Sequence, residues 1–282
     1  MAAAARATGH GEGAGLMRET TITVGGHPVR VLTGGDNPSA PPAVFFAGIG
    51  GVPTWVPFLE RLAESRRVIV PSLPGFPGAE DFRHLDTLLD WVVHCVETVE
   101  ALDEAPVDLI GSSAGGALAA EVAAIAGGLV NRLVLISPFG SHDTDDPGAD
   151  IWAQVPGPDS IPNLVCERPE AWKEAWQVPE GAEAIDYQVM HTRAMEAAAR
   201  YLFPFGDTGV VSRLHRVDHP TLLLRGSEDR VLPTSSNERF RAALAGPVRT
   251  GELEGAGHLP ELDRPDELAR EINAFLADQE LS

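Results

Sequence analysis

Short runs of branched and aromatic apolar residues alternate along this chain with longer stretches of helical periodicity. The runs at 43–46, 107–110, 129–136 and 221–224 have the length and composition of buried strands. Strands that alternate with helices are typical of a parallel sheet covered by helices on both faces. We therefore predict an α/β fold with a mostly parallel central sheet flanked by helices.

One helix of this pattern precedes the run at 107–110. It is predicted over 85–102, because its apolar residues recur at the spacing of a single helical face. A second helix is expected around 239–245, and a closing helix begins at Pro265. The face of the first helix that we expect to be buried comprises Leu85, Leu88, Leu89, Val92, Val96 and Val99.

Two neighbouring segments near the N-terminus depart from the alternation. Residues 1–18 are rich in Ala and Gly and lack the features of a secretion signal, which predicts a disordered N-terminal arm. Gly25-Gly26 separates two β-branched runs, so an antiparallel hairpin is expected at the edge of the sheet.

The third departure is an interruption in the middle of the chain. From 138 to 213 prolines and tryptophans replace the regular alternation, and we interpret this segment as an inserted helical cap. The α/β core then comprises 19–137 and 214–282.

Composition excludes several classes of partner. Acidic residues outnumber basic ones by 41 to 21, giving a formal net charge of −20, and a field of that sign repels nucleic acid and anionic membranes. No apolar run approaches the ~18 residues needed to cross a bilayer. Only two cysteines occur, so neither a disulfide framework nor a metal knuckle is indicated, and a cytoplasmic setting is the default. His215 and His219 have a spacing that could bind metal on a helix, but they precede a strand and lack a third ligand. We expect no metal and no organic cofactor.

The strongest chemical signal is the sequence Gly111-Ser112-Ser113-Ala114-Gly115. It has the form G-x-S-x-G and stands between an apolar strand and an Ala-rich helical segment. A sharp turn there would hold Ser113 in a strained conformation, with its hydroxyl above the carboxyl end of the strand and at the positive end of the following helix. Ser113 is therefore the candidate nucleophile. The competing interpretation is a tight turn with an inert hydroxyl.

Two further motifs follow in order, each at the end of a predicted strand. The strand at 222–224 leads into Gly226-Ser227-Glu228-Asp229, and Gly255-Ala256-Gly257-His258 follows the last predicted strand. With Ser113, this order of nucleophile, acid and histidine resembles the α/β-hydrolase superfamily. The resemblance implies a triad in which His258 accepts the serine proton and Asp229 orients the imidazole.

The same resemblance implies an oxyanion hole made by the backbone N–H groups of Ile49 and Ala114. Ile49 lies in the glycine-rich loop after the strand at 43–46. Similar proteins commonly have histidine before the first glycine of that loop, whereas this chain has Ala47. The difference leaves the backbone donor available and leaves open how the loop is held.

Alternatives exist for the acid and for the pocket. Glu228 could replace Asp229, whereas Asp143, Asp145 and Asp146 lie well beyond the strand end near Ser137, where some family members keep their acid. The cap tryptophans either line the substrate pocket or pack the cap onto the core. These residues are Trp152, Trp172 and Trp176.

The residues together predict a cofactor-independent serine hydrolase that acts on a small-molecule ester, thioester or related carbonyl through an acyl-enzyme. An enzymatic alternative is hydrolysis of a carbon–carbon bond in a vinylogous diketone, for which Arg193, Arg200 and Arg213 are candidates to bind a substrate carboxylate. A non-catalytic ligand-binding receptor is the alternative from another class. The oligomeric state is not determined by the sequence.

Overall fold

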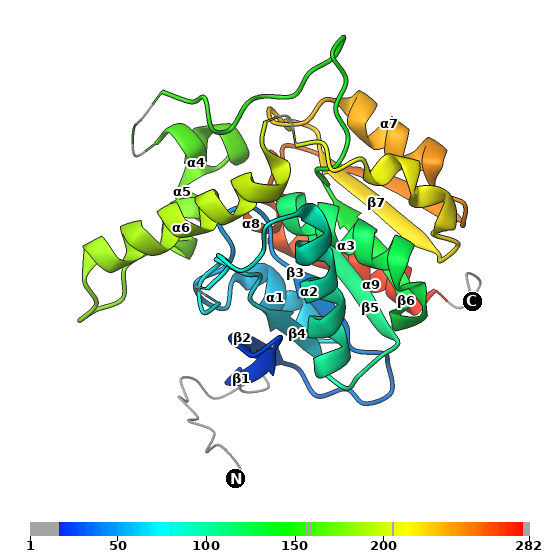
Figure 1. Cartoon of the computed structure of the whole chain (residues 1–282), viewed down its shortest axis with the longest axis horizontal. Coiled ribbons are helices and arrows are strands. Elements are labelled where there is room, and N and C mark those ends of the chain that lie inside the picture. Colours follow the sequence, from blue (N-terminus) through cyan, green and yellow to red (C-terminus); the bar gives the residue numbers. More distant parts are fainter. Residues whose placement is uncertain (1–16, 80, 156, 158, 205, 279–282) are drawn as a thin grey trace.

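An eight-stranded sheet forms the centre of the molecule (Figure 1). The computed structural model describes residues 17–79, 81–155, 157, 159–204 and 206–278. The strands are ordered β1-β2-β4-β3-β5-β6-β7-β8; β2 is antiparallel to both of its neighbours, and all pairs from β4 to β8 are parallel. The predicted fold class is confirmed. The strands are β1 (Arg18–Val24), β2 (His27–Gly34), β3 (Ala43–Phe46), β4 (Val68–Pro71), β5 (Val107–Ser112), β6 (Val130–Ile136), β7 (Thr221–Gly226) and β8 (Val248–Leu253).

The hairpin at the sheet edge forms around Gly25-Gly26, where Val24 pairs with His27. Both glycines have positive φ angles, 57° and 87°, which glycine adopts without steric cost. β1 begins at Arg18, so the sheet starts one residue before the expected core boundary. Of the expected N-terminal arm, residues 1–16 lie outside the described residues.

Helices cover both faces of the sheet (Figure 1). The helices α2 (Leu88–Ala101) and α3 (Ser113–Ile125) pack on one face. The short helix α1 (Pro57–Ala63) and the closing helix α9 (Pro265–Ala277) pack against each other on the opposite face. The strongly apolar strands β3, β4 and β5 are buried on both sides, as parallel strands between two helical layers must be.

The predicted buried face of α2 is partly wrong. A capping box between Thr87 and Asp90 starts the helix at Leu88, and Leu89 is exposed. Trp91 and Cys95 are buried instead. Periodicity alone did not separate these faces, because apolar residues occur almost all round this helix.

Other boundaries differ by a few residues. α7 (Thr234–Ala243) begins five residues before the expected helix at 239–245. The sequence analysis did not predict α1 or the one-turn helix α8 (Pro260–Asp263), because such short helices have little periodicity to recognise.

Three helices lie between β6 and β7, within the segment that we interpret as a cap. They are α4 (Ser160–Val165), α5 (Pro169–Ala175) and the long α6 (Ala184–Leu202), and they gather at one end of the sheet (Figure 1). Two 3₁₀ turns, Val210–Ser212 and Leu214–Arg216, return the chain to β7. Among the helices of the described residues, none has both the length and the apolar character that crossing a bilayer requires.

Candidate active site

The strand β5 turns directly into α3 at Ser113. Ser113 has a φ of 51°, in the left-handed region that costs a side-chain-bearing residue roughly 1–2 kcal/mol. The turn is tight: a Cβ added to Gly111 would lie 2.6 Å from the Gly115 carbonyl oxygen, and one added to Gly115 would lie 2.3 Å from the Phe46 carbonyl oxygen. Both flanking glycines are therefore required for the turn, and the strained serine is held at the end of β5.

The imidazole of His258 faces this serine. His258 lies in the loop after β8, and its Nε2 is 2.8 Å from Oγ of Ser113. Both residues are fully buried. The ring of Phe139 packs edge-on against the imidazole, with centroids 5.3 Å apart, and the Phe139 backbone N–H donates to the Ser113 carbonyl oxygen. The hydroxyl is thus within direct proton-transfer distance of the base.

The carboxylate of Asp229 lies on the other side of the imidazole. Nδ1 of His258 is 3.0 Å from Oδ2 of Asp229, and the backbone N–H groups of Val231 and Leu232 donate to Oδ1 at 2.9 Å and 3.0 Å. Burial raises the pKa of Asp229, but the adjacent His258 and these hydrogen bonds outweigh it and hold the pKa below its usual range. The residue is therefore ionised and oriented toward Nδ1.

Two backbone donors lie near the nucleophile. Ala114 is the second residue of α3, and Ile49 follows β3 in the loop against which Gly115 packs. Both are buried, and within the described residues neither N–H has a protein acceptor. These two N–H groups remain the candidates for an oxyanion hole.

The three cap tryptophans do not form one cluster. Trp172 and Trp176 stack with centroids 6.0 Å apart and lie over the loop after β3, because a Cβ added to Gly50 would be 2.9 Å from the Trp172 ring. Trp152 instead packs against Phe203 and lines a separate cavity of about 380 Å³ beside Phe139. Only the first two tryptophans lie against the candidate oxyanion loop.

The alternative acids lie elsewhere. Glu228 is exposed, and its carboxylate accepts a hydrogen bond from Ser227. Asp143 forms an ion pair with Arg239, and Asp146 accepts from Ser235. At the end of β6, Ser137 is buried with a φ of 41° and offers no carboxylate.

The candidate carboxylate-binding arginines do not converge on Ser113. Arg213 is paired with the buried Glu121, and Arg200 lies near Glu196 and over the Phe82 ring. Arg193 lines a surface hollow together with Phe82 and Glu196.

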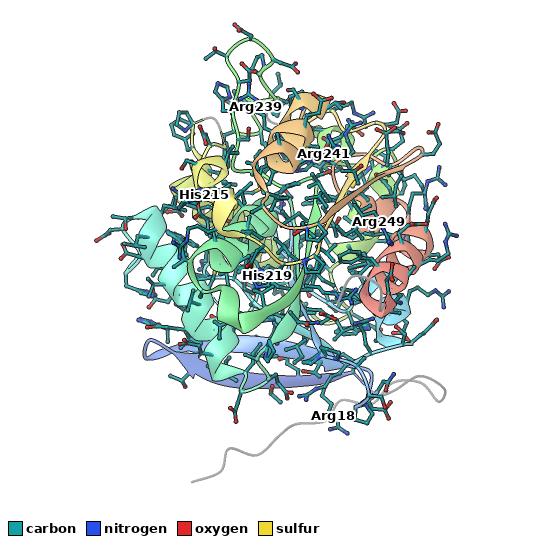
Figure 2. The ribbon with its side chains drawn as sticks, turned by 90° about the vertical axis from the view of Figure 1, so that its right-hand side faces the viewer. Arg18, His215, His219, Arg239, Arg241 and Arg249 are labelled. Atoms are coloured by element: carbon teal, nitrogen blue, oxygen red, sulfur yellow. The ribbon has the colours of Figure 1, made fainter. Side chains whose placement is uncertain are left out.

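Two groups of residues that include histidines contain atoms able to bind a metal ion. Figure 2 shows His215 and His219 lying apart, and Nδ1 of His215 is 3.0 Å from the Ser212 carbonyl oxygen. His27, Asp81 and His84 offer donor atoms within 4.8 Å of one another, but the two imidazoles are stacked 2° from parallel. Ring-nitrogen lone pairs lie in the ring plane, so one ion about 2 Å from each nitrogen does not fit both planes. We derive no metal chemistry from these groups.

Glu261 is a buried residue beside the site that the sequence analysis missed. Its Oε1 accepts a hydrogen bond of 2.6 Å from Oγ of Ser112, the residue before the nucleophile. Burial raises the pKa of Glu261 to about 7, although the hydrogen bond from Ser112 opposes the shift. A sequence signal existed: Glu261 stands three residues after His258 in the otherwise apolar run Leu259-Pro260-Glu261-Leu262.

Comparison with known proteins places this geometry in a family. The profile of the alpha/beta hydrolase family matches residues 43–271. The chain is 28% identical over 261 residues to the 2-hydroxy-6-oxo-2,4-heptadienoate hydrolase of Pseudomonas putida, covering 89% of this chain and 90% of that protein. It is 24% identical to a human monoacylglycerol lipase, covering 79% and 71% of the two chains.

Solved structures show the same fold. The 2-hydroxy-6-oxo-6-phenylhexa-2,4-dienoate hydrolase of a Rhodococcus species superposes with a TM-score of 0.71 at 21% identity, over 93% of this chain and 99% of that one. The strand order, the strained serine at the end of β5 and the family profile agree, and this chain belongs to the alpha/beta hydrolase family.

Proposed function

We propose that this hydrolase cleaves a small-molecule carboxylic ester or thioester through an acyl-enzyme formed on Ser113. The observation that carries the proposal is the continuous line of hydrogen-bonding groups from Ser113 Oγ to His258 Nε2, at 2.8 Å, and from His258 Nδ1 to Asp229, at 3.0 Å. A serine hydroxyl needs such a base to become a nucleophile, and the base needs a carboxylate to fix its tautomer and stabilise its cation.

The proposed reaction has two halves. His258 takes the Ser113 proton as Oγ attacks the substrate carbonyl, and the N–H groups of Ile49 and Ala114 stabilise the resulting oxyanion. The imidazolium then protonates the leaving alkoxide or thiolate, and an ester bond to Ser113 remains. In the second half His258 removes a proton from water as the water oxygen attacks the acyl carbon. The bond between that carbon and Ser113 Oγ then breaks, and the imidazolium returns the proton to Oγ, which releases the carboxylic acid and restores the serine.

Trp172 and Trp176 are proposed to contact the acyl group of the substrate. Their stacked rings lie against the loop that carries Ile49, the proposed oxyanion donor. Two aromatic rings at that position favour an apolar acyl group over a charged one. The free thiols Cys95 and Cys166 support action in a reducing, cytoplasmic compartment.

Carbon–carbon bond hydrolysis is a second candidate. The similarity to the hydrolase of 2-hydroxy-6-oxo-2,4-heptadienoate favours it. Against it stands the engagement of Arg200 and Arg213 with Glu196 and Glu121, since a dienoate carboxylate would need a cation near the site. We therefore place ester cleavage first.

Labelling with a fluorophosphonate tests the activated serine. The wild type and the Ser112→Ala variant are expected to take the label, whereas Ser113→Ala takes none and loses at least about 10³-fold in kcat. An unlabelled wild type would favour the receptor alternative. A series of acyl esters of increasing length, assayed beside a vinylogous diketone, separates the two hydrolytic candidates; faster turnover of the diketone would overturn the ester proposal.

A further inference from the structure

Ser112 and Glu261 form a closed polar pair in an apolar interior. Ser112 is fully buried, Glu261 is 3% exposed, and their oxygens are 2.6 Å apart. Within the described residues Oε2 of Glu261 has no hydrogen-bond partner. A buried carboxyl group with one free oxygen is costly, and such an arrangement calls for an explanation other than packing.

The pair lies where three segments of the site meet. A Cβ added to Gly48 would be 3.1 Å from Oε1 of Glu261, 3.2 Å from Oγ of Ser112 and 2.8 Å from the Leu259 side chain. Gly48 precedes Ile49, Ser112 precedes Ser113, and Leu259 follows His258. Each segment therefore carries one part of the proposed catalytic machinery. The Ser112–Glu261 pair lies at the point where the three segments meet.

We propose that Glu261 is a positioning residue that holds the loop carrying Ile49 at a fixed distance from the end of β5. This inference rests on the proposed hydrolase function. Ala47, at the start of that loop, has no polar side chain with which to hold it. The carboxyl group of Glu261 supplies the missing support, because it occupies the space where a side chain at Gly48 would lie and accepts a hydrogen bond from Ser112.

The charge state of Glu261 is set by its surroundings. The raised pKa of about 7 follows from burial. The hydrogen bonds from Ser112 and from the backbone N–H of Glu261 itself oppose the shift, as does the interaction with His258, whereas Asp263 adds to it. Cys166, from the end of α4, also interacts with Glu261. Ionisation would put an unpaired negative charge beside the loop that must stabilise a developing oxyanion. We therefore expect kcat of the proposed reaction to fall as Glu261 loses its proton.

The test compares kcat for a short-chain acyl ester between about pH 5.5 and about pH 9 in the wild type and in Glu261→Gln. Glutamine keeps an oxygen acceptor for Ser112 and cannot ionise. The ratio of variant to wild-type kcat is expected to be near one at the acid end and to rise at least about threefold, with a midpoint near the Glu261 pKa. Ionisations common to both proteins cancel in this ratio.

Three further variants separate positioning from structure. Glu261→Leu removes the acceptor and should lower kcat about tenfold at every pH with a smaller change in KM. Ser112→Ala removes a donor that favours the ionised carboxylate, so the midpoint should move to higher pH. Glu121→Gln alters an equally buried carboxylate that is paired with Arg213, and it should lower stability without changing the pH profile of kcat.

If the ratio of Glu261→Gln to wild-type kcat stays constant with pH, or falls as pH rises, the inference is overturned while the proposed hydrolase function stands. Wild-type kcat in Glu261→Leu overturns it as well. A wild type that neither hydrolyses esters nor takes a fluorophosphonate label overturns the proposed function itself, and the two failures are thereby distinguished.

Discussion

Two buried carboxyl groups interact with His258, one in the loop after β7 and one in α8, and their environments differ sharply. Asp229 receives two backbone N–H bonds and the imidazole contact, and its pKa is held below the usual range despite burial. Glu261 accepts from the Ser112 hydroxyl and from its own backbone N–H, and burial raises its pKa to about 7. Burial alone therefore does not decide whether a carboxyl group is charged. The number and kind of hydrogen-bond donors that reach the group also decide it.

This difference matches two roles. A carboxylate that must stabilise an imidazolium has to remain charged, which requires preorganised donors. A carboxyl group that supports a loop beside a developing oxyanion is better neutral. The chain provides donors at Asp229 through the turn at Val231 and Leu232, and it provides no comparable turn at Glu261 among the described residues.

The largest effect is expected from Asp229→Asn. The amide oxygen still accepts from Val231 and Leu232, so folding should persist, but the charge that stabilises protonated His258 is lost. We expect kcat to fall about 10³–10⁴-fold with a small change in KM. Steady-state kinetics and circular dichroism check both parts. Activity within tenfold of the wild type would show that Asp229 is not the functional acid.

Glu261→Gln should change stability in a pH-dependent manner. Because the folded protein raises the Glu261 pKa from 4.5 to about 7, the folded state binds this proton more tightly than the unfolded state. Stability from this group is therefore present below about pH 4.5 and is lost as pH rises to about 7, by about 3 kcal/mol.

Urea unfolding at about pH 4.5 and about pH 8 measures this effect. The variant, which has no ionisable group there, should gain stability relative to the wild type at the higher pH by roughly that amount. An unchanged difference between the two pH values would mean that Glu261 ionises as it does in the unfolded chain.

The smallest effect is expected from Glu228→Gln, the matched control for Asp229. Glu228 is next in sequence but exposed, with its carboxylate near Ser227. Removing its charge should change kcat by no more than about twofold. A loss comparable to that of Asp229→Asn would transfer the acid role to Glu228.

Much of the fold and of the site could be predicted because both follow local rules. Strand composition and helical periodicity predicted the sheet, and G-x-S-x-G between a strand and a helix predicted the strained turn at Ser113. Asp229 and His258 were expected from the resemblance of the ordered motifs to the α/β-hydrolase superfamily. The structure brings them together because the carboxyl ends of neighbouring parallel strands meet at one edge.

Prediction failed where long-range packing decides. Leu89 has the residue type of a buried position yet is exposed, because α2 packs against the core through the face that carries Trp91 and Cys95. The sequence pattern also did not indicate that Trp152 would lie apart from Trp172 and Trp176, since all three come from the segment 138–213.

The amino-acid sequence by itself determined the fold class, the order of the catalytic motifs and the residue types at the turn, because these depend on periodicity and on backbone conformations that only certain residues adopt. Only the tertiary structure decided which carboxyl groups are charged, which tryptophans lie over the loop after β3 and where Glu261 packs. Those properties depend on donors and surfaces contributed by segments far apart in the chain, and no local pattern encodes the distances between them.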